Sequence, residues 1–285
     1  MNLNDQDDLR LFDQLWRERQ PDAPAMVEFW NNRAASFNKL KNELEGQSCR
    51  QELVEKLSQL ATLDSNAQVL DIGCGPGHHS LLLARKAGRV VGLDLSPKMI
   101  ELARDNAQLE KAANVDFETL DWNAVNLDER GWKRKFRLVL ASRTQAVNDL
   151  AALRKMTDAC NGLCCLISQA DSSNSLRDRL KPLAGWDDLA ARTSRGFFCV
   201  FNLLWLMGFH PTVSYLDRHW ENELSLSEAR TIYGLHFESL FDLAEEQKEA
   251  IAAELAKMAE SGPLIEKVRS KVAVVAWTVP RVESS

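Results

Sequence analysis

The sequence lacks the charge surplus of proteins that bind nucleic acids. The 285-residue chain has 35 Lys and Arg against 41 Asp and Glu, which gives a formal net charge of −6 and a pI near 5.5. Proteins that grip phosphate backbones usually carry the opposite balance, so nucleic acid is a poor default partner. The basic residues clustered at 130–137 are expected to form a solvated loop.

Long hydrophobic runs are also missing. The longest apolar stretch, residues 196–209, is shorter than the ~20 residues of a membrane-spanning helix and contains Asn202. The chain begins Met1-Asn2-Leu3-Asn4-Asp5, without the charged-then-apolar plan of a signal peptide. We therefore expect no membrane partner.

Paired cysteine spacing is absent as well. The six cysteines, at positions 49, 74, 160, 164, 165 and 199, form no pattern of a disulfide framework, which favours a reducing cytoplasm. Cys160 comes just before residues 162–167, which contain Cys164 and Cys165 and which we interpret as a buried strand where a free thiol behaves as a small apolar residue. No metal site is expected there.

What is present is the composition of a soluble globular protein. Hydrophobic residues make up 45% of the chain and charged residues 27%. The length suits one α/β domain with substantial additions, or two small domains. The order of the motifs favours the first option.

The most informative stretch is residues 69–84. An apolar run ends on Asp71, a glycine-dense turn follows, and an apolar helix begins after it. This order predicts a strand, a tight loop and a helix. Gly73, Gly75 and Gly77 have the spacing G-x-G-x-G, whereas the dinucleotide fingerprint needs a glycine where His78 stands. The loop is therefore predicted to bind a nucleotide-like ligand other than a dinucleotide.

Residues 69–77, Val-Leu-Asp-Ile-Gly-Cys-Gly-Pro-Gly, resemble the first motif of the class I S-adenosylmethionine-dependent methyltransferases. The resemblance is firm over residues 69–168 and weak outside them. It implies an α/β fold with a seven-stranded, mostly parallel, doubly wound sheet. It also implies S-adenosylmethionine as cofactor, S-adenosylhomocysteine as product, and transfer of a methyl group to a small molecule.

The same resemblance implies which residues hold the cofactor. Asp94, at the end of the second predicted strand, would accept hydrogen bonds from the ribose hydroxyls. Asp121, after the third, would take the adenine amine, and the backbone N–H of Trp122 would meet the ring. Leu95 and Met99 either flank the adenine or pack in the core. The predicted cofactor residues are Asp71, Gly73, Gly75, Gly77, Asp94, Leu95, Met99, Asp121, Trp122 and Ser142.

Catalysis needs neither a metal nor a covalent intermediate, because a methyl group on a positively charged sulfur is already activated. His79 follows the loop in a first helical turn, where the helix dipole keeps an imidazole neutral. Arg143 ends the fourth predicted strand and would anchor an acidic acceptor. His219 comes from the late part of the chain. The catalytic assignment stays open among these three.

The chain is predicted to have three parts: a helical cap (1–65), the cofactor-binding core (66–170) and a substrate-side part (171–285). Helices are expected at 8–20, 24–46 and around 53–60, and segment 29–33 is the candidate for touching the cofactor from the cap. The N/D-P-P-Y/F tetrapeptide of amino-group methyltransferases is absent.

The last three strands are predicted at 163–168, 213–216 and 272–279. The 44 residues 169–212 and the 55 residues 217–271 are too many for structureless loops. The second connection contains a capping box at Ser225–Glu228 and an amphipathic helix at 245–258. We expect this helical insertion to cover the active-site end of the sheet, with His219, Trp220, Tyr233 and His236 lining a substrate pocket.

Two other functions stay open. The acceptor could be a protein or an RNA, with the insertion as a docking surface. The chain could instead be a catalytically silent cofactor-binding or interaction module. A nicotinamide dehydrogenase is disfavoured by His78. The oligomeric state, monomer or homodimer, is also open.

Overall fold

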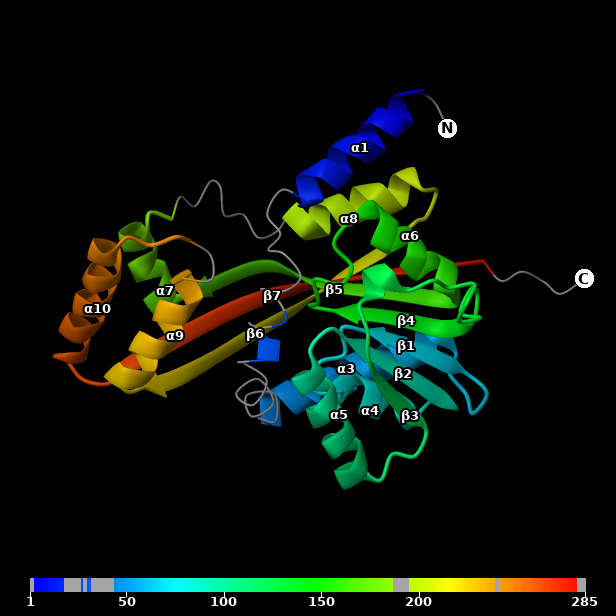
Figure 1. Cartoon of the computed structure of the whole chain (residues 1–285), viewed down its shortest axis with the longest axis horizontal. Helices are drawn as coiled ribbons and strands as arrows, with labels where there is room; N and C mark the ends of the chain where they lie inside the picture. Colours follow the sequence, from blue (N-terminus) through cyan, green and yellow to red (C-terminus); the bar gives the residue numbers. More distant parts are fainter. Residues whose placement is uncertain are drawn as a thin grey trace, which may run out of the picture. The chain divides into compact units, whose positions relative to one another are not determined.

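The computed structural model describes residues 3–17, 27, 30–31, 44–186, 195–238 and 241–280. They form an α/β fold around a seven-stranded sheet in the order β3-β2-β1-β4-β5-β7-β6 (Figure 1). The predicted fold class is confirmed. The strands are β1 (Gln68–Ile72), β2 (Arg89–Asp94), β3 (Val115–Thr119), β4 (Phe136–Ser142), β5 (Cys160–Asn174), β6 (Thr212–Leu224) and β7 (Leu264–Thr278).

The sheet is mostly parallel, as predicted. β1 pairs in parallel with β2 and β4, β2 with β3, and β4 with β5. β7 runs the other way: Gln169 of β5 bonds to Ser270, whereas Asn174, further along β5, bonds to the earlier Glu266. The carboxyl ends of β1 to β4 therefore share one edge, where α/β proteins bind their ligands.

The chain divides into two compact units. The first comprises Met1–Ser168, Gly196–Ser214 and Val274–Ser285, and the second comprises Gln169–Arg195 and Tyr215–Ala273. These units are structural. The predicted division into cap, core and substrate-side part stays a prediction about function.

The first unit has helices on both faces of its sheet. Figure 1 shows α3, α4 and α5 on one side and α1, α6 and α8 on the other. The bounds are α1 (Leu3–Arg17), α3 (Leu44–Ala61), α4 (His78–Ala84), α5 (Pro97–Glu110), the short 3₁₀ helix η1 (Trp122–Ala124), α6 (Leu150–Ala159) and α8 (Arg195–Leu206). The helix expected at 24–46 lies mostly outside the described residues. No helix in the described ranges is long and apolar enough to cross a membrane.

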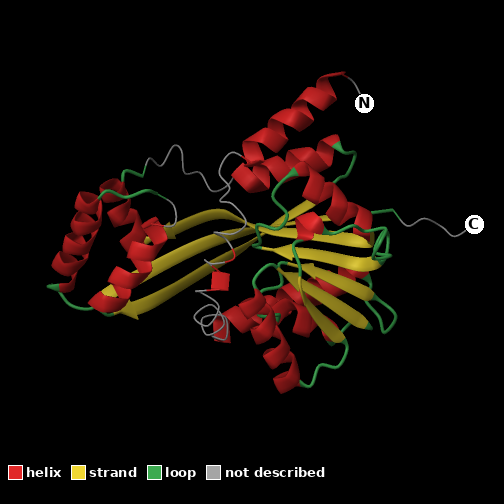
Figure 2. Cartoon of the chain, viewed as in Figure 1, coloured by secondary structure: helices red, strands yellow, loops and turns green. Residues whose placement is uncertain are grey.

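The second unit has its own core. Its helices α7 (Ser175–Leu180), α9 (Leu226–Glu238), α10 (Glu245–Ala259) and the 3₁₀ helix η2 (Lys181–Ala184) appear with its strands in Figure 2. The capping box is confirmed, since Ser225 N–H donates to Glu228 Oε2 at 2.9 Å and Glu228 N–H donates to Ser225 Oγ at 3.3 Å. α10 confirms the predicted amphipathic helix.

The last three strands are longer than predicted. β5 continues past Ser168 and β6 past Leu216, and β7 begins before Val272, so each strand has residues in both units. The added part of β7, residues 264–271, alternates between buried and exposed positions. Such a half-exposed strand lacks the continuous apolar run that marked the other strands.

The cysteine-rich part of β5 is buried, as predicted. Cys160, Cys164 and Cys165 are all in the core, and burial raises the pKa of the Cys165 thiol to about 12. Among the residues that the structure describes, no group of three or more His, Cys, Asp or Glu is placed to hold a metal ion.

Candidate cofactor site

The glycine loop joins β1 to α4 at the carboxyl edge of the first unit. Gly73, Gly75 and Gly77 have φ of +67°, +54° and +80°, in the left-handed region that favours glycine. A Cβ at Gly73 would lie 2.0 Å from Thr144 Oγ1. The left-handed backbone and the close packing at Gly73 therefore favour glycine in this loop. Without side chains at these positions, a ligand can approach the main chain directly.

One aromatic ring, Phe117 on β3, lies against two glycines. A Cβ at Gly77 would be 2.6 Å from Phe117 Cζ, and a Cβ at Gly92 in β2 would be 2.6 Å from Phe117 Cδ1. The ring is buried in a small cluster with Cys74, Ile100 and Ala103. The glycine loop, β2 and α5 thus close around this ring.

Asp71 fastens α4 to β1. The residue is 1% exposed, and Ser80 Oγ on α4 donates to its Oδ2 at 2.6 Å. A buried carboxylate requires such donors, so this contact fixes where α4 begins after the loop. The predicted role of Asp71 toward a cofactor stays a prediction.

Asp94 connects the end of β2 to the glycine loop. Its Oδ2 accepts a hydrogen bond from Gly75 N–H at 2.9 Å, and its Oδ1 accepts one from Ser96 N–H at 2.9 Å. The side chain is half-buried. The structure therefore brings together the two strongest features of the sequence, the glycine loop and the acid after it.

Ser96 connects this acid to the amino-terminal part of the chain. As the N-cap of α5, its Oγ accepts a hydrogen bond from Met99 N–H at 3.2 Å. The same Oγ donates to Asn31 Oδ1 at 2.6 Å. Asn31 belongs to segment 29–33, of which the structure describes Trp30 and Asn31. The sequence named this segment as a candidate, and the structure places Asn31 against the residue two positions after Asp94.

The end of β4 lies beside the loop. Ser142 pairs with Ile167, and Arg143 N–H donates to the Ile167 carbonyl at 2.8 Å. Arg143 is exposed and has a φ of +50°, a left-handed conformation that costs a non-glycine residue about 1–2 kcal/mol. Thr144 is the residue that packs on Gly73. The predicted residues of β1, β2 and β4 therefore share one edge of the first unit.

The comparisons with known proteins agree with this geometry. Residues 63–181 match a family model described as a methyltransferase domain. We call residues 63–181 the methyltransferase domain. Over 57 residues, 20% of this chain and 9% of the relative, the chain is 49% identical to human tRNA (uracil-5-)-methyltransferase homolog A. Over 95 residues, 33% of this chain, it is 35% identical to the 23S rRNA (uracil(1939)-C(5))-methyltransferase RlmD of Psychromonas ingrahamii.

The chain spans 9% and 21% of the lengths of these two relatives. A solved structure, geranyl diphosphate C-methyltransferase from Streptomyces coelicolor in complex with Mg²⁺, geranyl diphosphate and S-adenosyl-L-homocysteine, matches with a TM-score of 0.51 at 13% identity. That match covers 91% of this chain and 98% of the other, and it shows the shared fold.

The remaining predicted cofactor residues of the methyltransferase domain differ in exposure. Leu95 and Asp121 are half-buried, and Asp121 Oδ1 accepts a hydrogen bond from Asn123 N–H at 2.9 Å. Met99 is buried in the core. The indole of Trp122 is also in the core and donates to the Ala152 carbonyl at 3.4 Å. A ligand role for Trp122 would therefore rest on its main chain, as predicted for it.

The three catalytic candidates are not gathered in one unit. His79 is buried on α4 and Arg143 is exposed after β4, both in the methyltransferase domain. His219 is exposed on β6 in the second unit. Of these candidates, Arg143 is the one that lies exposed next to the residue packed on the glycine loop.

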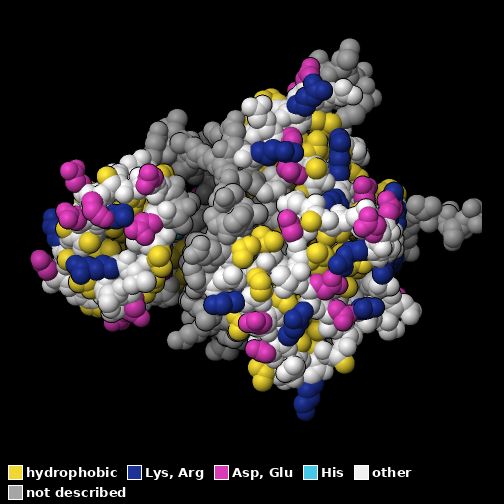
Figure 3. All heavy atoms as spheres, in the orientation of Figure 1, with side chains coloured by type: hydrophobic (Ala, Val, Ile, Leu, Met, Phe, Trp, Pro, Cys, Tyr) yellow, Lys and Arg dark blue, Asp and Glu magenta, His cyan; other side chains and the backbone are white. Residues whose placement is uncertain are grey.

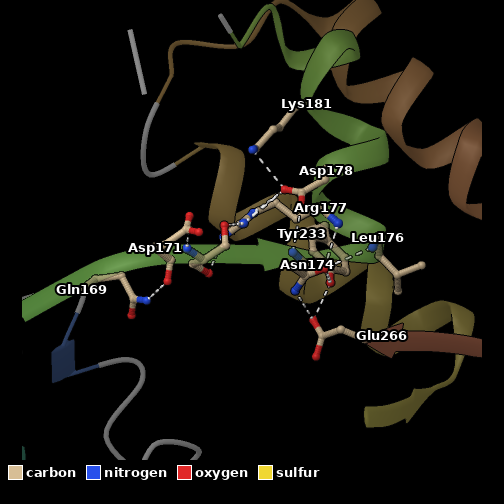
Figure 4. Close-up of polar contacts among 10 residues, drawn as sticks. Gln169, Asp171, Asn174, Leu176, Arg177, Asp178, Lys181, Tyr233 and Glu266 are labelled. Carbon is tan, nitrogen blue, oxygen red and sulfur yellow. Dashed lines mark hydrogen bonds and ion pairs between the residues drawn. The ribbon is translucent and has the colours of Figure 1, made fainter. Parts of the chain in front are cut away.

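The prediction that Tyr233 lines a pocket is wrong. Tyr233 is 2% exposed, and its hydroxyl donates to Glu266 Oε1, with Asn174 Oδ1 as the alternative acceptor 3.0 Å away (Figure 4). Burial, followed by the hydrogen bond and charge of Glu266, raises the pKa of Tyr233. Asn174 Nδ2 and Asn222 Nδ2 also donate to this carboxylate, at 2.8 and 2.6 Å. This cluster belongs to the core of the second unit.

Glu266, the centre of that cluster, was not among the residues predicted from the sequence. Its signal was the alternation of residues 264–271, in which Glu266 shares the inward face with Val268 and Ser270. A carboxylate at an inward strand position needs buried donors, which Tyr233 and the two asparagines supply.

Proposed function

We propose that this chain transfers the methyl group of S-adenosylmethionine to a small-molecule acceptor. One observation carries the proposal: the glycine loop, Asp94 and the end of β4 meet at one edge of the first unit. The hydrogen bond from Gly75 to Asp94 and the packing of Thr144 on Gly73 join them. When bound, the cofactor supplies an electrophilic methyl group on a positively charged sulfur.

The order of the strands supports this assignment. Along the edge, the sheet places Asp121 after β3, Asp94 at the end of β2, the glycine loop after β1 and Ser142 at the end of β4. Neighbouring strands are about 4.8 Å apart. Along this edge, the Asp121 carboxylate would accept a hydrogen bond from the adenine amine, and the Asp94 carboxylate would accept hydrogen bonds from the ribose. The main chain of the glycine loop, next in order, would then contact the methionine part of the cofactor. The end of β4 would follow beside the reacting methyl group.

The chemistry asks little more of the protein. Transfer forms a bond from the acceptor's nucleophilic atom to the methyl carbon and breaks the carbon–sulfur bond, leaving S-adenosylhomocysteine. The chain must hold the acceptor in line and exclude water. Arg143 is our first candidate for holding an acidic acceptor, and His79 and His219 stay candidates for removing a proton.

The charge distribution favours a small molecule over RNA. In the basic cluster at 130–137, Arg130 pairs with Glu118 at 2.8 Å and Lys133 lies 3.8 Å from Asp128. The Arg137 guanidinium donates to the Ala61 carbonyl at 2.8 Å. Figure 3 shows basic and acidic side chains interspersed on the face in view. Arginine and lysine side chains that already have such partners within the protein are poorly placed to bind the phosphates of an RNA backbone.

RNA is nevertheless the second candidate acceptor. It is favoured by the two relatives described above, which are named as RNA methyltransferases. Their matches cover 20% and 33% of this chain. The acceptor must therefore be tested separately from the cofactor.

Thermal shift tests the cofactor. We expect S-adenosylmethionine and S-adenosylhomocysteine to raise the melting temperature and NAD to leave it unchanged; at a ligand concentration of 100 times Kd the stabilisation is about 2.7 kcal/mol. Asp94→Ala should abolish the shift. Asp116→Ala is the matched control, because Asp116 is an exposed acid on β3 that pairs with Arg89 at 2.8 Å. Stabilisation by NAD alone would overturn the proposal.

Labelled methyl transfer tests the acceptor. The protein is incubated with methyl-labelled S-adenosylmethionine and either a small-metabolite extract or total RNA. We expect label in the small-molecule fraction. Label in the RNA alone would establish the second candidate, and label in neither would point to a silent binding module.

A further inference from the structure

Four residues form a continuous chain of hydrogen bonds at the edge of the first unit. Ser96 Oγ donates to Asn31 Oδ1 at 2.6 Å, Ser96 N–H donates to Asp94 Oδ1 at 2.9 Å, and Gly75 N–H donates to Asp94 Oδ2 at 2.9 Å. These hydrogen bonds connect the amino-terminal part of the sequence to the glycine loop. Asn31 and Ser96 are 65 residues apart in sequence.

Asn31 decides where the Ser96 hydroxyl points. A hydroxyl has one proton to donate, and the Ser96 oxygen already accepts from Met99 N–H at 3.2 Å. Its proton goes to Asn31 Oδ1. Because Ser96 is 1% exposed, bulk water is a poor substitute for that acceptor. Removing the Asn31 amide would turn the hydroxyl toward another acceptor and loosen the cap of α5.

Loosening Ser96 acts on Asp94. The two residues are joined by the bond from Ser96 N–H to Asp94 Oδ1, so the start of α5 and the orientation of the carboxylate are set together. The other carboxylate oxygen is tied to Gly75. The bonds from Gly75 and Ser96 thus hold the carboxylate through both of its oxygens.

We propose that Asn31 is a positioning residue for the cofactor site, which acts through Ser96 to orient the Asp94 carboxylate toward the ribose. The inference rests on the proposed function, since it takes Asp94 as the ribose ligand. It assigns a specific task to the amino-terminal part of the chain. By linkage, a cofactor that favours the oriented carboxylate also favours the Asn31–Ser96 contact.

Titration calorimetry with S-adenosylhomocysteine tests this inference. A hydrogen bond of ordinary strength corresponds to a threefold to tenfold change in affinity, roughly, so Asn31→Ala should weaken binding by that factor. Ser96→Ala should weaken it similarly, and the double variant should bind no worse than Ser96→Ala alone, because both remove the same contact. Asn202→Ala is the matched control; this asparagine lies on α8 and donates to the Phe198 carbonyl at 2.7 Å.

A second cycle separates positioning from general destabilisation. In an Asp94→Asn background, where the carboxylate is gone, Asn31→Ala should have no further effect on affinity. Equal affinity of Asn31→Ala and the wild type, or independent effects of Asn31 and Asp94, would overturn the inference and leave the proposed function standing. Failure of the wild type itself to bind S-adenosylhomocysteine would overturn the proposed function and the inference with it.

Discussion

Replacing Gly73 with alanine tests the packing of the glycine loop. Gly73 has a φ of +67°, and an added Cβ would lie 2.0 Å from Thr144 Oγ1 and 2.5 Å from Thr144 Cβ. The left-handed backbone costs an alanine about 1–2 kcal/mol, and overpacking adds about 1–3 kcal/mol. We therefore expect Gly73→Ala to lower the free energy of unfolding by about 2–5 kcal/mol.

Two further variants separate these two costs. Gly131 has a φ of +61° with nothing within 4 Å of an added Cβ, so Gly131→Ala carries the backbone cost alone. Thr144→Gly removes all three contacting side-chain atoms, Oγ1, Cβ and Cγ2. Combined with Gly73→Ala, it should recover the steric part of the loss, a coupling energy of about 1–3 kcal/mol.

The assay is urea unfolding followed by tryptophan fluorescence, since Trp122, Trp132 and Trp277 lie in the core of the first unit. The slopes of the transitions must match for the free energies to be compared. If Gly73→Ala costs no more than Gly131→Ala, or if Thr144→Gly brings no relief, the close approach of the loop to the end of β4 is refuted.

Two more predictions concern buried titratable groups. Tyr233→Phe removes a hydrogen-bond donor to the buried Glu266 carboxylate and should lower the stability of the second unit by about 1–3 kcal/mol. This loss should be measurable as faster amide exchange in α9 and β7. Tyr215→Phe is the control and should leave the exchange rates unchanged, because the Tyr215 side chain is 50% exposed. Burial raises the pKa of Cys165 to about 12, so folded protein keeps a proton that unfolded chains release above about pH 8.5. The contribution of the protonated Cys165 thiol to the free energy of unfolding is therefore complete below that pH. It decreases by about 1.4 kcal/mol per pH unit as the pH rises toward 12. Urea unfolding at pH 8, 9 and 10 should show this decline, with a smaller slope in Cys165→Ala; equal slopes would contradict it.

The sequence predicted the first four strands well because their limits are local. β2 (Arg89–Asp94) ends at Asp94 as predicted, since it lies between the turn at Ala87-Gly88 and the cap at Ser96-Pro97. Ser96 caps α5, since its Oγ accepts a hydrogen bond from Met99 N–H. Where one short segment carries both the apolar run and its stop signal, the element can be predicted without knowing its neighbours.

What the sequence could not predict depends on distant partners. The extensions of β5 and β7 are stabilised by pairs such as Gln169 with Ser270, about a hundred residues apart. Taken alone, the polar composition of these two extensions predicts a loop. The contact of Asn31 with Ser96 has no local signal either. Tyr233 was misplaced for the same reason, because nothing near it in the sequence announces Glu266.

The ring of Phe117 imposes a condition on how this sequence can evolve. Because the ring fills the space where both Gly77 and Gly92 would carry a Cβ, an alanine at either position would force the phenylalanine ring to shift. We expect the three positions to covary among relatives, with a smaller residue at 117 wherever 77 or 92 has gained a side chain. A glycine loop grafted from this chain onto another scaffold would need the aromatic residue grafted with it.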